Sequence, residues 1–137
     1  GKGVKIMVDE ELIGVESRPV SVKVTAERVR RFTEAIGVSF DGTVPPTFII
    51  TMLDIKIPGL ELPLEGAIHG EQKFIYHRPL QIGDTITYTT SIKQVYHRQG
   101  KLGKMTFVSV ETKGYNLARE QVFAGISTVI IPRKGDE

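Results

Sequence analysis

The second half of the chain reads as one β-sheet, and this restricts the possible folds more than any other feature. Four apolar or alternating runs of strand length follow one another there. They span residues 68–78, 85–96, 105–115 and 122–131. Turn signals at Gln99-Gly100-Lys101 and near Asn116-Leu117 separate the later runs. We therefore expect four antiparallel strands. The last of them should lie inside the sheet because it is apolar on both faces, and Pro132 should end it.

The first half of the chain predicts one well-marked helix. Thr25 is a suitable N-cap, Glu27 places an acid in the first turn, and Gly37 occupies the usual stop position. The apolar stripe of this helix consists of Val29, Phe32 and Ile36. Before it, residues 9–13 predict a short helical turn closed by Gly14, and residues 20–24 alternate as a short strand does.

The segment between this helix and the sheet is harder to assign. Residues 38–44 read as a loop whose turn is Asp41-Gly42. Pro45-Pro46-Thr47 then opens the apolar stretch 48–55, whose β-branched residues favour a strand, whereas a proline in a first turn favours a helix. A helix after a strand, an apolar segment and four long strands together indicate an α+β domain.

Length and composition limit the class of protein. The 137 residues match a single domain, residues 1–137, with 40% hydrophobic residues. With 18 Lys+Arg against 16 Asp+Glu, the net charge of +2 does not favour a nucleic-acid partner. The absence of Cys excludes disulfides, thiolate metal ligands and a Cys nucleophile. No run reaches the roughly 18 apolar residues of a membrane span, so we expect a cytoplasmic protein without membrane contact.

Three segments, in this order, resemble a known family. They are VPPTF at residues 44–48, IHGEQKFIYHRPLQIGDTI at residues 68–86, and the closing strand at residues 121–132. They look like the amino-terminal domain of MaoC-type dehydratases and are similar to the accessory subunit of heterodimeric (3R)-hydroxyacyl-thioester dehydratases. The resemblance implies the hot-dog fold, in which a curved sheet wraps a central helix at residues 46–55. It also implies that two such domains pair through their edge strands and bind an acyl-CoA or acyl-ACP thioester between them.

The chemistry implied by the resemblance is the reversible addition of water to a 2-enoyl thioester. An Asp/His pair handles the water, while backbone amides at the start of the central helix polarise the thioester carbonyl. Catalytic members carry an Asp-x-Asn-Pro-x-His segment before the central helix. Here that interval is GVSFDGTV, residues 37–44, which contains Asp41 and no His. The sequence therefore favours a subunit that works as a homo-oligomer or as a heterodimer with a catalytic MaoC-like chain.

Two residues of the 68–78 strand are candidates for acid/base catalysis. Strict alternation would place His69 and Glu71 on one face, where they would form a replacement pair near the mouth of the cleft. The structural alternative is that His69 caps the strand and hydrogen-bonds a backbone carbonyl. Asp41 also has two readings, as a surviving catalytic acid or as an ordinary Asp-Gly turn residue.

Four further residues are candidates for substrate binding. The resemblance implies that the amide of Thr47 or Phe48 faces the thioester oxygen. Gln72 would donate to a carbonyl or satisfy a neighbouring loop, and Arg78 would bind a phosphate or form an ion pair at the sheet edge. A further basic group would either meet coenzyme A phosphates or an acidic carrier protein, or remain solvated. It consists of Lys93, His97, Arg98, Lys101 and Lys104.

No other site pattern competes with these candidates. The chain has no glycine-rich phosphate loop, no zinc-binding His pair and no nucleophile elbow, so we expect neither a metal nor a cofactor. Two classes of function remain: a hydratase/dehydratase or its subunit, and a non-catalytic module that binds or scaffolds acyl thioesters. Thioesterase chemistry is a weaker third, because residues 46–52 lack the acid that such an enzyme needs at its central helix.

Overall fold

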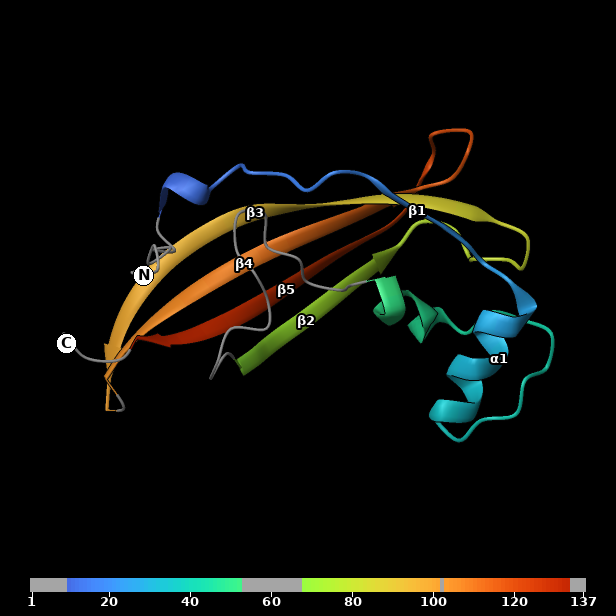
Figure 1. Ribbon diagram of the computed structural model, residues 1–137, viewed down its shortest axis with the longest axis horizontal. Coiled ribbons are helices and arrows are strands. Elements are labelled where there is room, and N and C mark those ends of the chain that lie inside the picture. Colours follow the sequence, from blue (N-terminus) through green and yellow to red (C-terminus); the bar gives the residue numbers. More distant parts are fainter. Residues whose placement is uncertain (1–9, 53–67, 102, 134–137) are drawn as a thin grey trace, which may run out of the picture.

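The structure is a computed structural model that describes residues 10–52, 68–101 and 103–133 (Figure 1). Its elements are η1 Glu10–Leu12, β1 Val20–Lys23, α1 Ala26–Ala35, η2 Pro46–Met52, β2 Ile68–Tyr76, β3 Thr85–Gly100, β4 Gly103–Tyr115 and β5 Gln121–Arg133. The predicted α+β order of elements is thus confirmed. Among the described residues, no helix is long and apolar enough to cross a bilayer.

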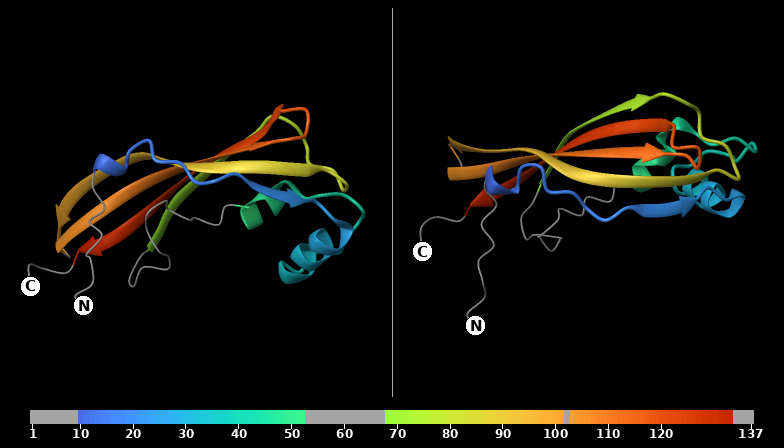
Figure 2. Two further views of the ribbon diagram at one scale, coloured as in Figure 1. Left: turned by 45° about the horizontal axis from the view of Figure 1, so that its top comes forward. Right: turned by 90° about the horizontal axis from the view of Figure 1, so that it is seen from above.

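The strands form one antiparallel sheet in the order β1-β3-β4-β5-β2. The sheet is curved, and α1 and η2 lie together at one end of it (Figures 1 and 2). As predicted, β5 is interior, because it pairs with β4 on one side and β2 on the other. The outer strands of the described sheet are β1 and β2.

The core lies on the face of the sheet that η2 covers. On β4, every second residue from Thr106 to Gly114 is buried, which is the period expected of a strand with one covered face. One buried cluster joins η2 and α1 to the sheet and contains Val24, Val29, Phe48, Ile49, Met52, Leu80, Ile86, Val122 and Phe123. A second cluster lies further along the strands and contains Ile92, Val95, Val108, Val110 and Val129.

The first cluster depends on a cross-strand pair of a glycine and an aromatic ring. Gly114 of β4 pairs with Phe123 of β5, whose side chain is fully buried. A Cβ atom added to Gly114 would lie 2.1 Å from Cε1 of the Phe123 ring. The ring therefore occupies space that only glycine leaves open.

The helix α1 begins and ends where its sequence signals predict. The Thr25 side chain accepts a hydrogen bond from the Arg28 amide at 3.2 Å, and Gly37 has a φ of 78°, which favours glycine. Val29 is buried, and Phe32 packs edge-on against Phe48 with ring centroids 5.6 Å apart. Ile36, predicted to continue the apolar stripe, is instead 50% exposed, because it is the C-cap beyond the helix.

Several predicted boundaries were wrong by a few residues. Pro132 does not end β5: it pairs with Met105 of β4, and the strand continues to Arg133. β3 extends to Gly100 and β4 begins at Gly103, so Gln99 and Gly100, predicted as turn residues, belong to β3. The helix predicted from residue 46 does begin there, as a 3₁₀ helix over Pro46–Met52; its predicted end at residue 55 stays a prediction, because residues 53–55 lie outside the described residues.

Candidate functional site

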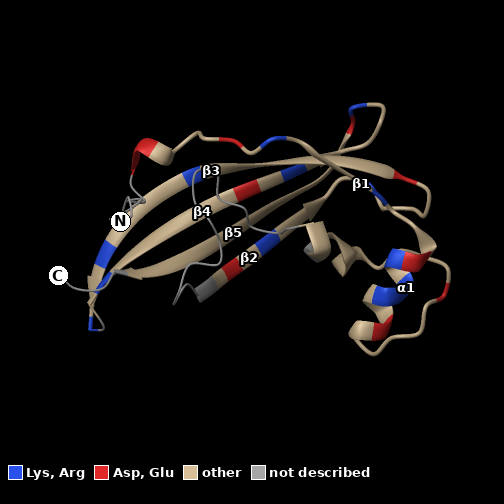
Figure 3. Ribbon diagram, viewed as in Figure 1, with Lys and Arg blue, Asp and Glu red and all other residues tan. Residues whose placement is uncertain are grey.

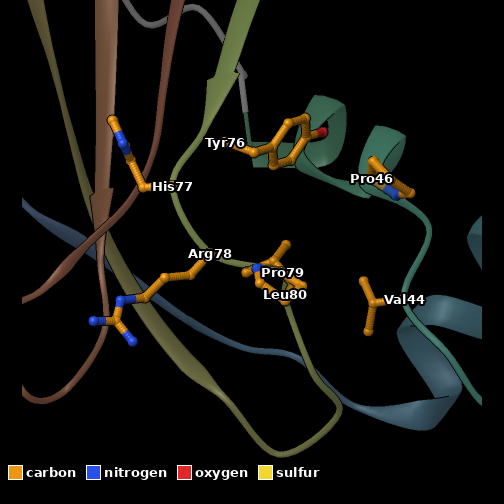
Figure 4. A pocket seen from close by; sticks show the side chains of 7 residues that line it. All are labelled: Val44, Pro46, Tyr76, His77, Arg78, Pro79 and Leu80. Atoms are coloured by element: carbon orange, nitrogen blue, oxygen red, sulfur yellow. The ribbon is translucent and has the colours of Figure 1, made fainter.

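A cavity of about 330 Å³ lies where β2 ends and η2 begins. Its described lining consists of Val44, Pro46, Tyr76, His77, Arg78, Pro79 and Leu80 (Figure 4). Residues more than 30 positions apart in the sequence thus form one site. The amides of His77 and Arg78 both donate to the Val122 carbonyl, at 2.8 and 3.3 Å, and so hold this segment against β5.

The lining side chains differ in direction. The Tyr76 ring extends toward η2 and faces Pro46, whereas the side chains of His77 and Arg78 point away from the cavity (Figure 4). The Arg78 guanidinium forms an ion pair with Glu120 at 2.5 Å, which is the structural alternative considered above for this residue. Glu120 also accepts a hydrogen bond from the Asn116 side chain at 3.0 Å. The cavity is therefore walled mainly by proline and aliphatic groups.

Tyr76 was not among the residues that the sequence pointed to. It is the last residue of β2 and pairs with Phe123. Burial raises the pKa of the Tyr76 phenol, so the hydroxyl is protonated at neutral pH and can donate a hydrogen bond. Its position directly before His77-Arg78-Pro79 was the available signal, but alternation alone does not identify which residue of a strand end faces a cavity.

A second cavity, of about 460 Å³, lies between β1, α1 and η2. It has an apolar floor and two arginines, and its described lining is Val22, Arg28, Arg31, Phe32, Ala35, Phe48, Thr51 and Met52. Arg31 is paired with Glu27 at 2.7 Å, one helical turn away. Among the predicted binding residues, Phe48 lies here and Arg78 lies at the first cavity.

The backbone amides at the start of η2 differ in their hydrogen bonding. The Phe48 amide donates to the Pro45 carbonyl at 2.9 Å, so it is already engaged within the chain. The Thr47 amide has no acceptor among the residues that the structure describes. Thr47 is exposed and lines neither of the two cavities.

The β2 candidates lie along an irregular stretch of the strand. His69 pairs with Val129 and Gln72 with Ser127, and the register shifts between them, so the strict alternation that would unite His69 and Glu71 is interrupted. Glu71 forms an exposed ion pair with Lys73 at 3.1 Å. The His69 side chain lies outside the described part of the chain. His69 precedes Tyr76 by seven residues, or roughly 20 Å along the strand, so it is remote from the first cavity.

Asp41 closes a turn in the loop before η2. Its carboxylate accepts hydrogen bonds from the Thr43 hydroxyl at 2.5 Å and the Thr43 amide at 2.9 Å. The hydroxyl, and then the amide, lower the pKa of the Asp41 carboxyl. Gly42 completes the turn with a φ of 90°. The carboxylate thus has the geometry of the turn residue that was its alternative reading.

The basic group of the β3–β4 hairpin is partly engaged within the chain. The strand β3 carries Lys and Arg side chains and contains no Asp or Glu (Figure 3). Lys93 pairs with Glu111 at 3.5 Å, His97 shares a hydrogen bond with the Thr106 hydroxyl at 2.9 Å, and the Arg98 guanidinium lies 4.9 Å from the Tyr96 ring centroid. Within the described ranges, no group of three or more His, Cys, Asp or Glu side chains is placed to hold a metal ion.

Comparison with known proteins identifies the family. Residues 11–124 match the family model described as FAS1-like, dehydratase domain region. A curated relative, a UPF0336 protein of Streptomyces avermitilis, is 27% identical over 152 residues that cover 95% of this chain and 98% of that protein.

Solved structures agree on the fold. The C-terminally truncated HadBC (3R-hydroxyacyl-ACP dehydratase) complex of Mycobacterium tuberculosis matches with a TM-score of 0.67 and 19% identity, over 87% of this chain and 96% of that chain. R-hydratase PhaJ1 of Pseudomonas aeruginosa matches with a TM-score of 0.67 and 17% identity, over 89% and 83%. This chain therefore belongs to the FAS1-like dehydratase domain region family, and it has the hot-dog fold of the MaoC-like dehydratases.

Proposed function

We propose that the chain is an acyl-thioester-binding subunit of a MaoC-like hydratase/dehydratase. The observation that carries this proposal is the cavity at the start of η2, which combines apolar walls with the absence of Asp and Glu from its described lining. Such a site can exclude water from an acyl group and hold it. Its described lining offers no carboxylate for the acid/base pair that addition of water to an enoyl thioester requires.

In this proposal the Asp/His pair comes from a second, catalytic MaoC-like chain. A structural neighbour, HadBC, is described as a complex, which supports an assembly of two hot-dog chains. The strand β2 is the edge of the described sheet, and an unpaired edge strand favours pairing with another strand. The ligand would be an acyl-CoA or acyl-ACP, with its acyl part in the cavity. The chain would bind and orient the ligand, and the partner would transfer the proton during the addition or removal of water.

Binding can be tested with hexanoyl-CoA and, as a matched control, free coenzyme A. Because a ligand that binds only the native state stabilises it, hexanoyl-CoA should raise the melting temperature, and coenzyme A should raise it less. The difference between the two ligands isolates the acyl group. Equal shifts for both ligands, or no shift for either, would contradict an acyl site.

The alternative function is a non-catalytic module that binds or scaffolds acyl thioesters. It is favoured by the same absence of acidic residues from the described lining of the cavity. It predicts acyl-CoA binding as above, but no hydration of an enoyl thioester in any combination with catalytic MaoC-like chains.

A further inference from the structure

Tyr76 contributes the polar side chain of the described cavity lining that extends toward η2 and not away from the cavity (Figure 4). Apart from Tyr76, the described lining consists of Val, Leu and Pro side chains together with His77 and Arg78, whose side chains point away (Figure 4). A cavity with apolar walls and one hydrogen-bonding group has the composition of a site that orients a mainly apolar ligand by a single polar contact.

Tyr76 is 37% exposed, so its hydroxyl is accessible to a ligand, and the hydroxyl has no hydrogen-bond partner among the described residues. The backbone of Tyr76 is fixed by its pairing with Phe123 on β5, which places the base of the side chain at the cavity. A hydroxyl that is accessible at the cavity can donate to an acceptor atom of a ligand.

The charge of the surroundings indicates which acceptor fits. The guanidinium of Arg78, the arginine of the described lining, is directed away from the cavity and paired with Glu120 at 2.5 Å. No cationic side chain of the described lining therefore points into the cavity, and a buried carboxylate would lack the charge partner that it needs. A neutral carbonyl oxygen is the better match to a single phenolic donor.

We propose that the Tyr76 hydroxyl donates a hydrogen bond to the carbonyl oxygen of the acyl thioester and thereby positions the acyl group in the cavity. This inference rests on the proposed function, because it requires that an acyl thioester binds there. It adds the contact that would discriminate a thioester from an equally apolar ligand without a carbonyl group.

The test compares hexanoyl-CoA with S-hexyl-CoA, a thioether in which a methylene replaces the carbonyl group. Titrations use the full chain in the assembly that it forms. Wild type should bind hexanoyl-CoA about 3–10-fold more tightly, as expected for one neutral hydrogen bond. Tyr76→Phe should remove this preference, because it should weaken the binding of hexanoyl-CoA and leave the binding of S-hexyl-CoA unchanged. Tyr96→Phe, which removes a hydroxyl from a ring stacked on Phe107 at the hairpin end of β3, should change neither affinity.

Three results would count against the inference, and they are distinguishable. A Tyr76→Phe variant that keeps the full preference for the thioester overturns the inference and leaves the proposed function intact. Equal weakening of both ligands by Tyr76→Phe, with an unchanged melting temperature, also overturns it, because the ring and not the hydroxyl then matters. If wild type binds neither ligand, both the proposed function and the inference are overturned.

Discussion

At the scale of single residues, the candidate site depends on how a few side chains are placed at the end of β2. Phe123 packs over Gly114 of β4, and its backbone pairs with Tyr76 of β2, so one interior residue of β5 connects the core to the strand end at the first cavity. Arg78, by contrast, is held outside the cavity by Glu120. The chemistry of the site therefore depends on which side chains are directed toward the cavity.

Replacing Gly114 with alanine should destabilise the protein by about 1–3 kcal/mol, because the new methyl group would overlap the Phe123 ring. Urea unfolding measures this loss. Gly100→Ala is the matched control, since its nearest neighbour is Met105 Cε at 3.5 Å and its backbone is not in the left-handed region. It should change the free energy of unfolding by less than about 0.5 kcal/mol. Equal effects of the two substitutions would contradict the packing argument.

The Asp41 turn should make stability depend on pH in acid. Its folded-state pKa lies below the ordinary value of 3.8, so the ionised form is stabilised by folding. That contribution is present above the ordinary pKa and is lost as the pH falls through the folded-state pKa. Asp41→Asn should therefore be less stable than wild type at pH 7, and the difference should shrink toward pH 3. A difference that does not change over this range would show that the carboxylate is not responsible.

At the scale of elements, local signals predicted the described helices and strands well. The cap at Thr25, the stop at Gly37 and the alternation of the strands each depend on neighbours in sequence. The errors occurred where tertiary contacts decide. A register shift between Ile92 and Gln94 lets Ile92 and Val95 both be buried, and another between His69 and Gln72 interrupts the predicted face of β2. The hydrophobic periodicity of the sequence does not predict such a register shift.

The site was predicted less completely for the same reason. The resemblance identified the segments that meet at the first cavity, residues 44–48 and 68–86. It did not indicate that Tyr76 faces inward while His77 and Arg78 face away, because side-chain direction at the end of a strand depends on the turn that follows. The roles predicted for His69, Glu71, Gln72 and Thr47 stay predictions.

The helix α1 should be sensitive to its cap. Thr25→Ala removes the acceptor for the Arg28 amide and should cost about 1 kcal/mol in the free energy of unfolding. Ser39→Ala is a suitable control, because Ser39 is exposed in a loop and its hydroxyl has no partner in the described structure. Chemical denaturation measures the free energy of unfolding of both variants. A Thr25→Ala variant as stable as the control would contradict this account of α1.

At the scale of the whole molecule, the edge strand β2 predicts self-association or pairing with another chain. In sedimentation at micromolar concentration, the purified protein should have at least twice the mass of the 15.2 kDa chain. The reason is that an edge strand exposes unpaired backbone N–H and C=O groups, which favour pairing with another strand. A single species of 15.2 kDa would rule out self-association through β2 and a site shared between two copies of this chain.

The central claim is that this chain contributes binding but not the acid/base pair. Hydration of crotonyl-CoA, followed by loss of the enoyl thioester absorbance, tests it most directly when the chain is assayed alone and then with a candidate catalytic MaoC-like chain. We expect no turnover by the chain alone, and more turnover by the pair than by the catalytic chain alone. Robust hydration by the isolated chain, abolished by His69→Ala in a protein that still folds, would contradict the claim.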